Sequence, residues 1–143
     1  MKKLFLTLAS AFVCFSASLL AQTPVGTWKT IDDETKEAKS YVEVFESNGK
    51  LYGKITKLLL KPADTVCDKC KDDKKNQKVV GMVIVSDLSL KDGYYQGGSI
   101  LDPTKGDYYK CSLWLQGNDA NVLNVKGKHW SGISRTQKWY RVN

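Results

Sequence analysis

Eight short segments in which apolar and polar residues alternate constrain the fold of this chain more than any other feature. They are rich in Val, Ile, Thr, Tyr and Trp and are separated by Gly, Asn and Asp, whereas helical periodicity is weak after residue 22. This pattern predicts an all-β domain, and about eight strands suffice to close a small antiparallel barrel. The expected strands cover residues 27–31, 40–46, 51–60, 79–86, 94–100, 107–116, 121–126 and 134–142.

The segment Ser47-Asn48-Gly49-Lys50 predicts a tight hairpin, because Asn and Gly both tolerate the positive φ of a type I′ turn. A two-residue loop sets the register of the flanking strands. The expected cross-strand pairs are Phe45–Tyr52, Val44–Gly53, Glu43–Lys54 and Val42–Ile55. One face of this hairpin then points into the barrel with Val42, Val44, Leu51 and Ile55.

Two further turns predict that neighbouring strands are joined directly, in an up-and-down order. In the segment 102–106, Asp102 can cap a type I turn, Pro103 fits its second position and Gly106 fits its left-handed closing position. The other turn lies at residues 117–119. The side chains expected to point inward after these turns are Tyr109, Cys111, Leu113, Leu115, Leu123 and Val125. The paired glycines Gly97 and Gly98 lie within a strand and predict a bulge or a sharp bend.

The first 21 residues have the features of a cleaved signal peptide. Lys2 and Lys3 precede an apolar run that continues to Leu20, and cleavage is expected after Ala21. A retained membrane anchor is the alternative, but the run is short for a bilayer span and no basic cluster follows it. We therefore expect an exported protein, periplasmic or extracellular, with a single domain over residues 22–143 and no stable membrane anchor.

The net charge of the full chain is +7, and removal of residues 1–21 lowers it to +5. The lysines are spread along the sequence and mixed with Asp and Glu, which is typical of a solvated surface. Together with export, this distribution argues against a nucleic-acid partner.

Three cysteines remain after residue 21, and Cys67-Asp68-Lys69-Cys70 is the sharpest local motif. In an oxidising compartment the motif predicts a Cys67–Cys70 disulfide that ties a long, polar surface loop over residues 61–78 near its middle and leaves Cys111 as a free thiol. A Cys67–Cys111 bridge would close a longer loop and is the thermodynamic alternative. A zinc site that includes Cys111 and His129, and a thioredoxin-like redox centre, are further alternatives.

No residue pattern in the chain predicts catalysis. His129 is the only histidine, and the spacing places no Ser or Cys beside it as a nucleophile. Phosphate-binding loops, dinucleotide fingerprints and HExxH motifs are all absent from the sequence. We therefore expect no enzyme activity, no metal and no cofactor.

The segment Gly26-Thr27-Trp28, which opens the first expected strand, resembles the structural signature of lipocalins and their calycin relatives. In that superfamily the Trp closes one end of the barrel and a basic residue of the last strand packs across it. The last expected strand holds Arg135 and Arg141, of which we assign Arg135 to this role. The resemblance implies a structural cation–π contact.

Residues 24–142 as a whole resemble an exported, lipocalin-like bacterial family known as domain of unknown function 2147. The resemblance rests on five segments: 25–28 (VGTW), 49–55 (GKLYGKI), 80–82 (VGM), 98–103 (GSILDP) and 135–142 (RTQKWYRV). The chain departs from the family pattern at 128–133 (KHWSGI), where the family has a Gly- and Leu-rich run. The resemblance implies a barrel that carries a small apolar ligand, and it supplies no reaction.

These observations predict a binding protein of the cell envelope whose barrel admits a small, largely apolar molecule. Its ligand-binding surface would be the inward face formed by Val42, Val44, Leu51, Ile55, Tyr109, Leu113, Leu115, Leu123 and Val125. Tyr95, Tyr109 and Trp130 are candidates for framing its mouth. The alternative is a filled, ligand-free barrel that serves as an interaction or structural module through its outer surface.

Overall fold

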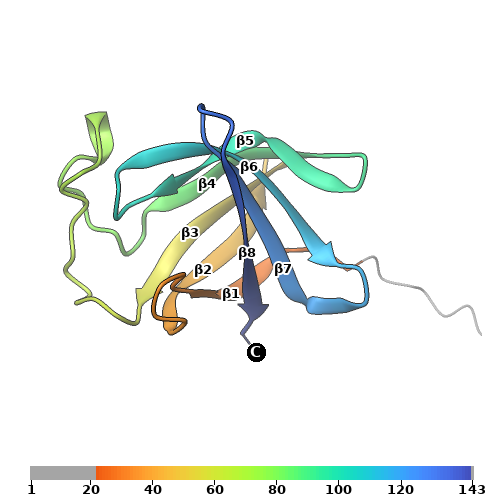
Figure 1. The fold of residues 1–143 in the computed structure, drawn as a ribbon, viewed down its shortest axis with the longest axis horizontal. Helices are drawn as coiled ribbons and strands as arrows, with labels where there is room; N and C mark the ends of the chain where they lie inside the picture. The colour runs from red at the N-terminus through yellow and green to blue at the C-terminus, as the bar shows by residue number, and fades with distance from the viewer. Residues whose placement is uncertain (1–21, 143) are drawn as a thin grey trace, which may run out of the picture.

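The strands of the chain follow one another around a closed antiparallel barrel in a computed structural model that describes residues 22–142 (Figure 1). The predicted signal peptide lies outside the described residues. The barrel closes where β1 pairs with β8, with Trp28 opposite Arg141. The fold class and the up-and-down order are thus confirmed. The strands are β1 (Gly26–Ile31), β2 (Ala38–Ser47), β3 (Lys50–Leu58), β4 (Val83–Lys91), β5 (Tyr94–Asp102), β6 (Asp107–Gln116), β7 (Asp119–Lys128) and β8 (Ser134–Arg141).

The β2–β3 hairpin has the predicted register, with all four expected cross-strand pairs in place. Its turn residues Asn48 and Gly49 both have positive φ. On the outer face the rings of Phe45 and Tyr52 stack with centroids 5.8 Å apart, and Lys54 Nζ lies 4.0 Å from Glu43 Oε1. The inner face, formed by Val42, Val44, Leu51 and Ile55, is buried.

Two other turns also agree with the sequence. Asp102 caps the β5–β6 turn, where its side chain accepts a hydrogen bond from Thr104 N and its carbonyl accepts one from Gly106 N. Gly97 adopts a φ of 89°, and the β5–β6 register shifts between Tyr95 and Gly98. The glycine pair therefore forms a bulge, as predicted.

The fourth strand differs from the sequence prediction of residues 79–86, because β4 spans Val83–Lys91. Val79 is part of a turn instead, in which Met82 N donates to the Val79 carbonyl and Gly81 has a φ of 90°. At the other end, Asp92 and Gly93 form a two-residue turn with positive φ that joins β4 to β5. This Asp-Gly pair is a hairpin signal of the same kind as Asn48-Gly49, and it was overlooked in the sequence.

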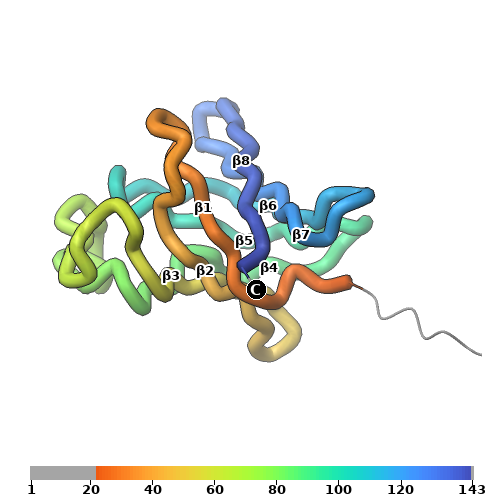
Figure 2. Tube along the Cα trace, turned by 90° about the horizontal axis from the view of Figure 1, so that it is seen from below, coloured from red at the N-terminus to blue at the C-terminus, as the bar shows by residue number. Residues whose placement is uncertain are grey.

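The connections divide the barrel into two unlike ends (Figures 1 and 2). Three two-residue turns, at residues 48–49, 92–93 and 117–118, lie at one end with the start of β1 and the end of β8, and we call this the closed end. The connections 32–37, 59–82, 103–106 and 129–133 lie at the other, open end. In Figure 1 the long 59–82 connection is at the left, and the β4–β5 and β6–β7 turns are at the right.

The 59–82 connection contains the Cys67–Cys70 disulfide and a short 3₁₀ helix, η1 (Asp72–Lys74). The disulfide was predicted, but the position of its cysteines on the surface was not correct, since both are buried against the core. A Cβ atom at Gly106 would collide with the carbonyl oxygen of Lys69. The connection therefore packs tightly on the β5–β6 turn and is part of the wall at the open end.

Candidate functional site

A cavity of about 870 Å³ occupies the open end of the barrel. Its walls come from all eight strands and from all four connections at this end. The strands provide most of the apolar lining, and the connections add charged and polar side chains together with apolar ones such as Val79 and Ile133. The apolar lining includes Ile55, Leu58, Val79, Ile84, Ile100, Leu101 and Val125.

Only three of the nine predicted ligand-binding residues line this cavity, namely Ile55, Tyr109 and Val125. The other six lie elsewhere in the interior. Leu115 is half-buried against the packed core. The other five are fully buried in that core: Val42, Val44, Leu51, Leu113 and Leu123. Alternation identifies which side chains point inward, but it does not give their height along the barrel axis.

Trp28 fills the closed end of the barrel. Its side chain is fully buried, and its indole Nε1 donates a hydrogen bond to the Pro24 carbonyl at 2.8 Å. Cζ of Arg141 lies 4.3 Å from the centroid of the Trp28 ring, which is the geometry of a cation–π contact. Arg141 also donates to the carbonyls of Thr23, Val25 and Ala120.

Arg141, and not Arg135, is therefore the basic residue that packs across Trp28. Because β8 runs antiparallel to β1, Trp28 is opposite Arg141, and Arg135 lies six positions away, about 20 Å along the strand. Gly26 belongs to the same contact, since a Cβ atom there would come within 2.8 Å of Arg141 Nη1. Three residues, Gly26, Trp28 and Arg141, thus form the structural signature.

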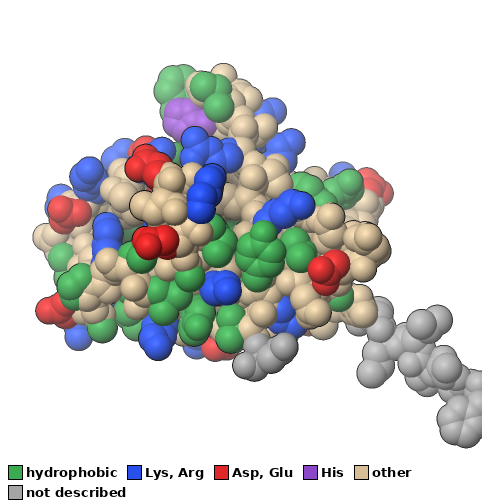
Figure 3. Space-filling model, turned by 60° about the horizontal axis from the view of Figure 1, so that its bottom comes forward, with side chains coloured by type: hydrophobic (Ala, Val, Ile, Leu, Met, Phe, Trp, Pro, Cys, Tyr) green, Lys and Arg blue, Asp and Glu red, His purple; other side chains and the backbone are tan. Residues whose placement is uncertain are grey.

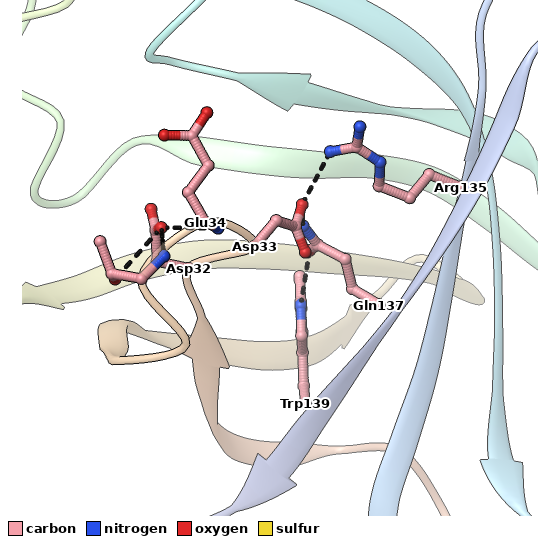
Figure 4. Close-up of polar contacts among 7 residues, drawn as sticks. Asp32, Asp33, Glu34, Arg135, Gln137 and Trp139 are labelled. Atoms are coloured by element: carbon pink, nitrogen blue, oxygen red, sulfur yellow. Dashed lines mark hydrogen bonds and ion pairs between the residues drawn. The ribbon is translucent and has the colours of Figure 1, made fainter.

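Arg135 instead takes part in a polar cluster at the open end (Figure 4). Asp33, in the β1–β2 connection, accepts hydrogen bonds from Arg135 Nη1 at 3.0 Å and from Gln137 Nε2 at 2.8 Å. The buried Trp139 donates through Nε1 to Gln137 Oε1 at 3.3 Å. The chain of contacts runs from the exposed mouth down the cavity wall, and it ties the β1–β2 connection to β8.

The neighbouring Asp32 serves a local purpose. Its carboxylate accepts hydrogen bonds from the backbone N–H groups of Thr35 and Glu34 and from the Thr35 hydroxyl. These bonds, that of Thr35 N first, lower the pKa of the Asp32 carboxyl. They shape the turn that presents Asp33 to β8.

One buried polar pair faces the cavity between β1 and β2. Thr30 and Ser40 are opposite each other, and their hydroxyl oxygens are 2.7 Å apart. Both residues line the cavity and both are buried. Sequence reasoning missed them, although they continue the inward pattern of Trp28 and Val42 by two residues on each strand.

The β7–β8 connection brings together a second pair that was not predicted. His129 Nδ1 lies 2.8 Å from the Ser131 hydroxyl oxygen, and the imidazole ring packs near Tyr109 with centroids 5.6 Å apart. The His129–Ser131 contact joins two residues of one turn that are two positions apart in the sequence. Among the described residues no carboxylate hydrogen-bonds to this imidazole, so the third group of a catalytic triad is missing from the pair.

Of the expected mouth aromatics, Tyr109 lines the cavity, Trp130 is exposed at the open end and Tyr95 packs on the core. Cys111 is a buried free thiol, as predicted. Burial raises its pKa to about 12, so the thiol stays protonated and unreactive at neutral pH. The Cys67–Cys70 disulfide leaves neither sulfur as a free thiolate.

Residues 22–142 hold neither a cluster of metal-ligating side chains nor a membrane-spanning helix. Over this range no three His, Cys, Asp or Glu side chains gather in a way that could hold a metal ion. Within the same range no helix is both long enough and apolar enough to cross a bilayer.

A closed eight-stranded barrel with an aromatic plug at one end and a cavity at the other defines a lipocalin-like protein. It is similar to a solved structure of protein HP1028 from the human pathogen Helicobacter pylori, which is described as belonging to the lipocalin family. The TM-score is 0.73 at 22% sequence identity, over 86% of this chain and 85% of that one. The family model for an uncharacterized protein conserved in bacteria, DUF2147, matches residues 26–141, and the chain belongs to that family. No curated protein matches the sequence.

Proposed function

We propose that this protein binds one small, largely apolar molecule in the cavity at the open end of its barrel. The cavity carries the proposal. Its volume of about 870 Å³ lies within the range of roughly 300–1,000 Å³ that is typical of small-molecule sites. An eight-stranded barrel filled by its own side chains would leave no such space.

The composition of the wall supports an apolar ligand with a small polar part. Aliphatic side chains such as Ile55, Ile100 and Val125 provide most of the deep surface. The Thr30–Ser40 hydroxyl pair provides a polar group on the wall, and the Asp33–Arg135–Gln137 cluster provides others nearer the mouth. A few placed polar groups in an apolar site fix the orientation of a ligand, while burial supplies the affinity.

Export to the cell envelope or beyond is part of the proposal. The charged start and apolar run of residues 1–21 support it, and so does the Cys67–Cys70 disulfide, because such bonds persist in oxidising compartments. We assign a carrier or storage role and no reaction, since within residues 22–142 no carboxylate hydrogen-bonds to the imidazole of the His129–Ser131 pair.

A titration with a fluorescent fatty acid tests this function. We expect saturable binding of one probe per barrel, in the micromolar range, because apolar burial contributes about 25 cal/mol per Å² before the costs of association. High salt should leave this binding unchanged, since burial is not screened, whereas attachment of the probe to surface lysines would weaken.

Ile100→Trp is the blocking variant, since Ile100 lines the cavity and is only half-buried. Leu90→Trp is the matched control, because Leu90 is exposed on β4 near the closed end. Ile100→Trp should abolish binding and keep the β-type circular dichroism spectrum, while Leu90→Trp should bind normally. If neither variant nor the parent binds any probe, the barrel acts through its surface and the binding function is wrong.

A further inference from the structure

The tip of the β7–β8 connection exposes two large apolar side chains next to the mouth of the cavity. Trp130 is 89% exposed and Ile133 is 74% exposed, the two highest values among the large hydrophobic residues that the structure describes. Figure 3 shows hydrophobic side chains gathered at a protruding tip beside the single histidine, with Lys and Arg side chains directly below it. An exposed apolar tip of this kind lowers the solubility of a protein unless a partner surface covers it.

The tip is held in this outward position by its own hydrogen bonds. His129 N donates to the Ile133 carbonyl at 2.8 Å, and Gly132 N donates to the His129 carbonyl at 2.9 Å. Gly132 has a φ of 93°, a conformation that favours glycine. Because the loop is already ordered, little conformational entropy is lost when its side chains become buried in an apolar environment.

The tip and the strand ends beside it carry positive charge. Residues 126–135 contain Lys126, Lys128 and Arg135 and no acidic residue. Arg135 is paired with Asp33, so the two lysines supply the free positive charge. At the same end the 59–82 connection has six lysines and four aspartates, whereas the 32–37 connection has four acidic residues and one lysine, so the positive charge belongs to the tip and not to the whole end.

Apolar residues flanked by lysines fit one kind of partner best. Trp has an apolar body and a polar N–H, and it concentrates at membrane–water interfaces together with basic residues that contact anionic head groups. A second copy of this chain would bring the same lysines against each other, which is unfavourable. The charge therefore selects an anionic lipid surface over self-association.

We propose that the β7–β8 tip docks the open end of the barrel on an anionic bilayer. Trp130 and Ile133 enter the interface, and Lys126 and Lys128 contact head groups. Since His129, Ser131 and Ile133 also line the cavity, docking at this tip places the cavity mouth at the lipid surface. The inference goes beyond ligand binding and does not require that the cavity hold a ligand.

Co-sedimentation with vesicles tests the docking. The form that begins at Gln22 is used, because the closed barrel spans residues 26–141 and the apolar run of residues 1–21 could bind lipid by itself. The vesicles contain phosphatidylglycerol mixed with phosphatidylcholine, or phosphatidylcholine alone. The tip variant is Trp130→Ser/Ile133→Ser, and the control is Leu90→Ser, at a residue 62% exposed near the closed end.

We expect the parent and Leu90→Ser to bind the anionic vesicles equally. The tip variant should bind more weakly by a factor of roughly ten or more. Burial of one large apolar side chain contributes more free energy than a tenfold change in affinity requires. Lys128→Gln should weaken binding by about fivefold at low salt and have less effect at high salt. Tryptophan emission should shift to the blue on binding in the parent and not in Trp130→Phe.

Four outcomes would overturn the docking: no vesicle binding by the parent, equal binding by the tip variant and Leu90→Ser, equal binding of the parent to both kinds of vesicle, or a concentration-dependent dimer that the tip variant abolishes. The vesicle assay contains no cavity probe. A barrel that binds vesicles but no fatty acid would therefore refute the proposed function alone.

Discussion

The closed and open ends of the barrel are made from the same strands, yet one is packed and the other holds a cavity. On β1, β2 and β7 the inward side chains become smaller from the closed end to the open end, which contributes to this difference. On β1 the inward residue changes from Trp28 to Thr30, and on β2 it changes from Val42 to Ser40. On β7 the series is Leu123, Val125 and Gly127, and Gly127 packs beside Tyr109.

The connections reinforce this gradient. Two-residue turns and the Trp28–Arg141 contact leave no room at the closed end. The longer connections at the open end form a rim, which the Cys67–Cys70 disulfide and the Asp33–Arg135 pair hold in place. A barrel of this kind thus separates the residues that pack its core from those that line its cavity.

The largest expected effect of a substitution is at the closed end. Trp28→Ala should lower the free energy of unfolding by about 3–5 kcal/mol, as for other buried aromatic residues truncated to Ala. Trp130→Ala, at the exposed tip of the open end, should change it by less than about 0.5 kcal/mol. Urea unfolding of both variants measures the two changes in unfolding free energy. Equal losses would show that the two ends do not differ in their contribution to stability.

Cys111, on the interior between the two ends, gives a pH-dependent contrast. Its pKa in the folded chain is raised to about 12 from a usual value of 9.0, so from about pH 9 upward the unfolded chain loses this proton and the folded chain keeps it. Stability from this group is complete below pH 9 and falls by about 1.4 kcal/mol per pH unit above it, until the folded thiol also ionises. Unfolding free energies of the parent and of Cys111→Ala, measured across this range, should therefore differ in slope. Parallel curves would mean that Cys111 is accessible to solvent.

A smaller effect separates the two arginines of β8. Arg141→Met should cost about 2 kcal/mol, because it removes a cation–π contact and hydrogen bonds to three carbonyls. Arg135→Met should cost less than about 1 kcal/mol, since its ion pair with Asp33 is solvent-exposed. Urea unfolding of both variants measures these losses. A larger loss for Arg135→Met than for Arg141→Met would show that Arg135 is the arginine of the structural signature.

Local signals predicted local structure well. The Asn48-Gly49 pair was enough to establish the four partners from Phe45–Tyr52 to Val42–Ile55, because a two-residue turn leaves one register. Beyond them the register shifts, and Tyr41 lies opposite Lys57. The displacement of β4 has an equally local cause. Val79 and Val80 look like the start of a strand, but Gly81 turns the chain, and the strand begins at Val83 after Met82 has bonded to β3.

The candidate site was predicted less completely than the fold. The sequence separated inward from outward side chains, so Ile55, Tyr109 and Val125 were identified as interior residues. It did not separate the packed half from the cavity, because Val42 and Val125 look alike in a pattern of alternating residues. The Asp33–Arg135–Gln137 cluster joins residues about a hundred positions apart, and no local signal links them.

By itself, then, the sequence determined the all-β class and the strand order, since both depend on alternation and turn chemistry. The short spacing of Cys67 and Cys70 favoured their disulfide over a bridge to Cys111, and the closing role of Trp28 came from the resemblance to lipocalins. Only the tertiary structure decided which arginine covers Trp28, how deep each inward residue lies and that both cysteines are buried. Barrel closure brings β8 beside β1, so the height of a side chain depends on the register of strands that are far apart in the sequence. The cavity is a consequence of that long-range register, and the residues that line it become neighbours only when the barrel closes.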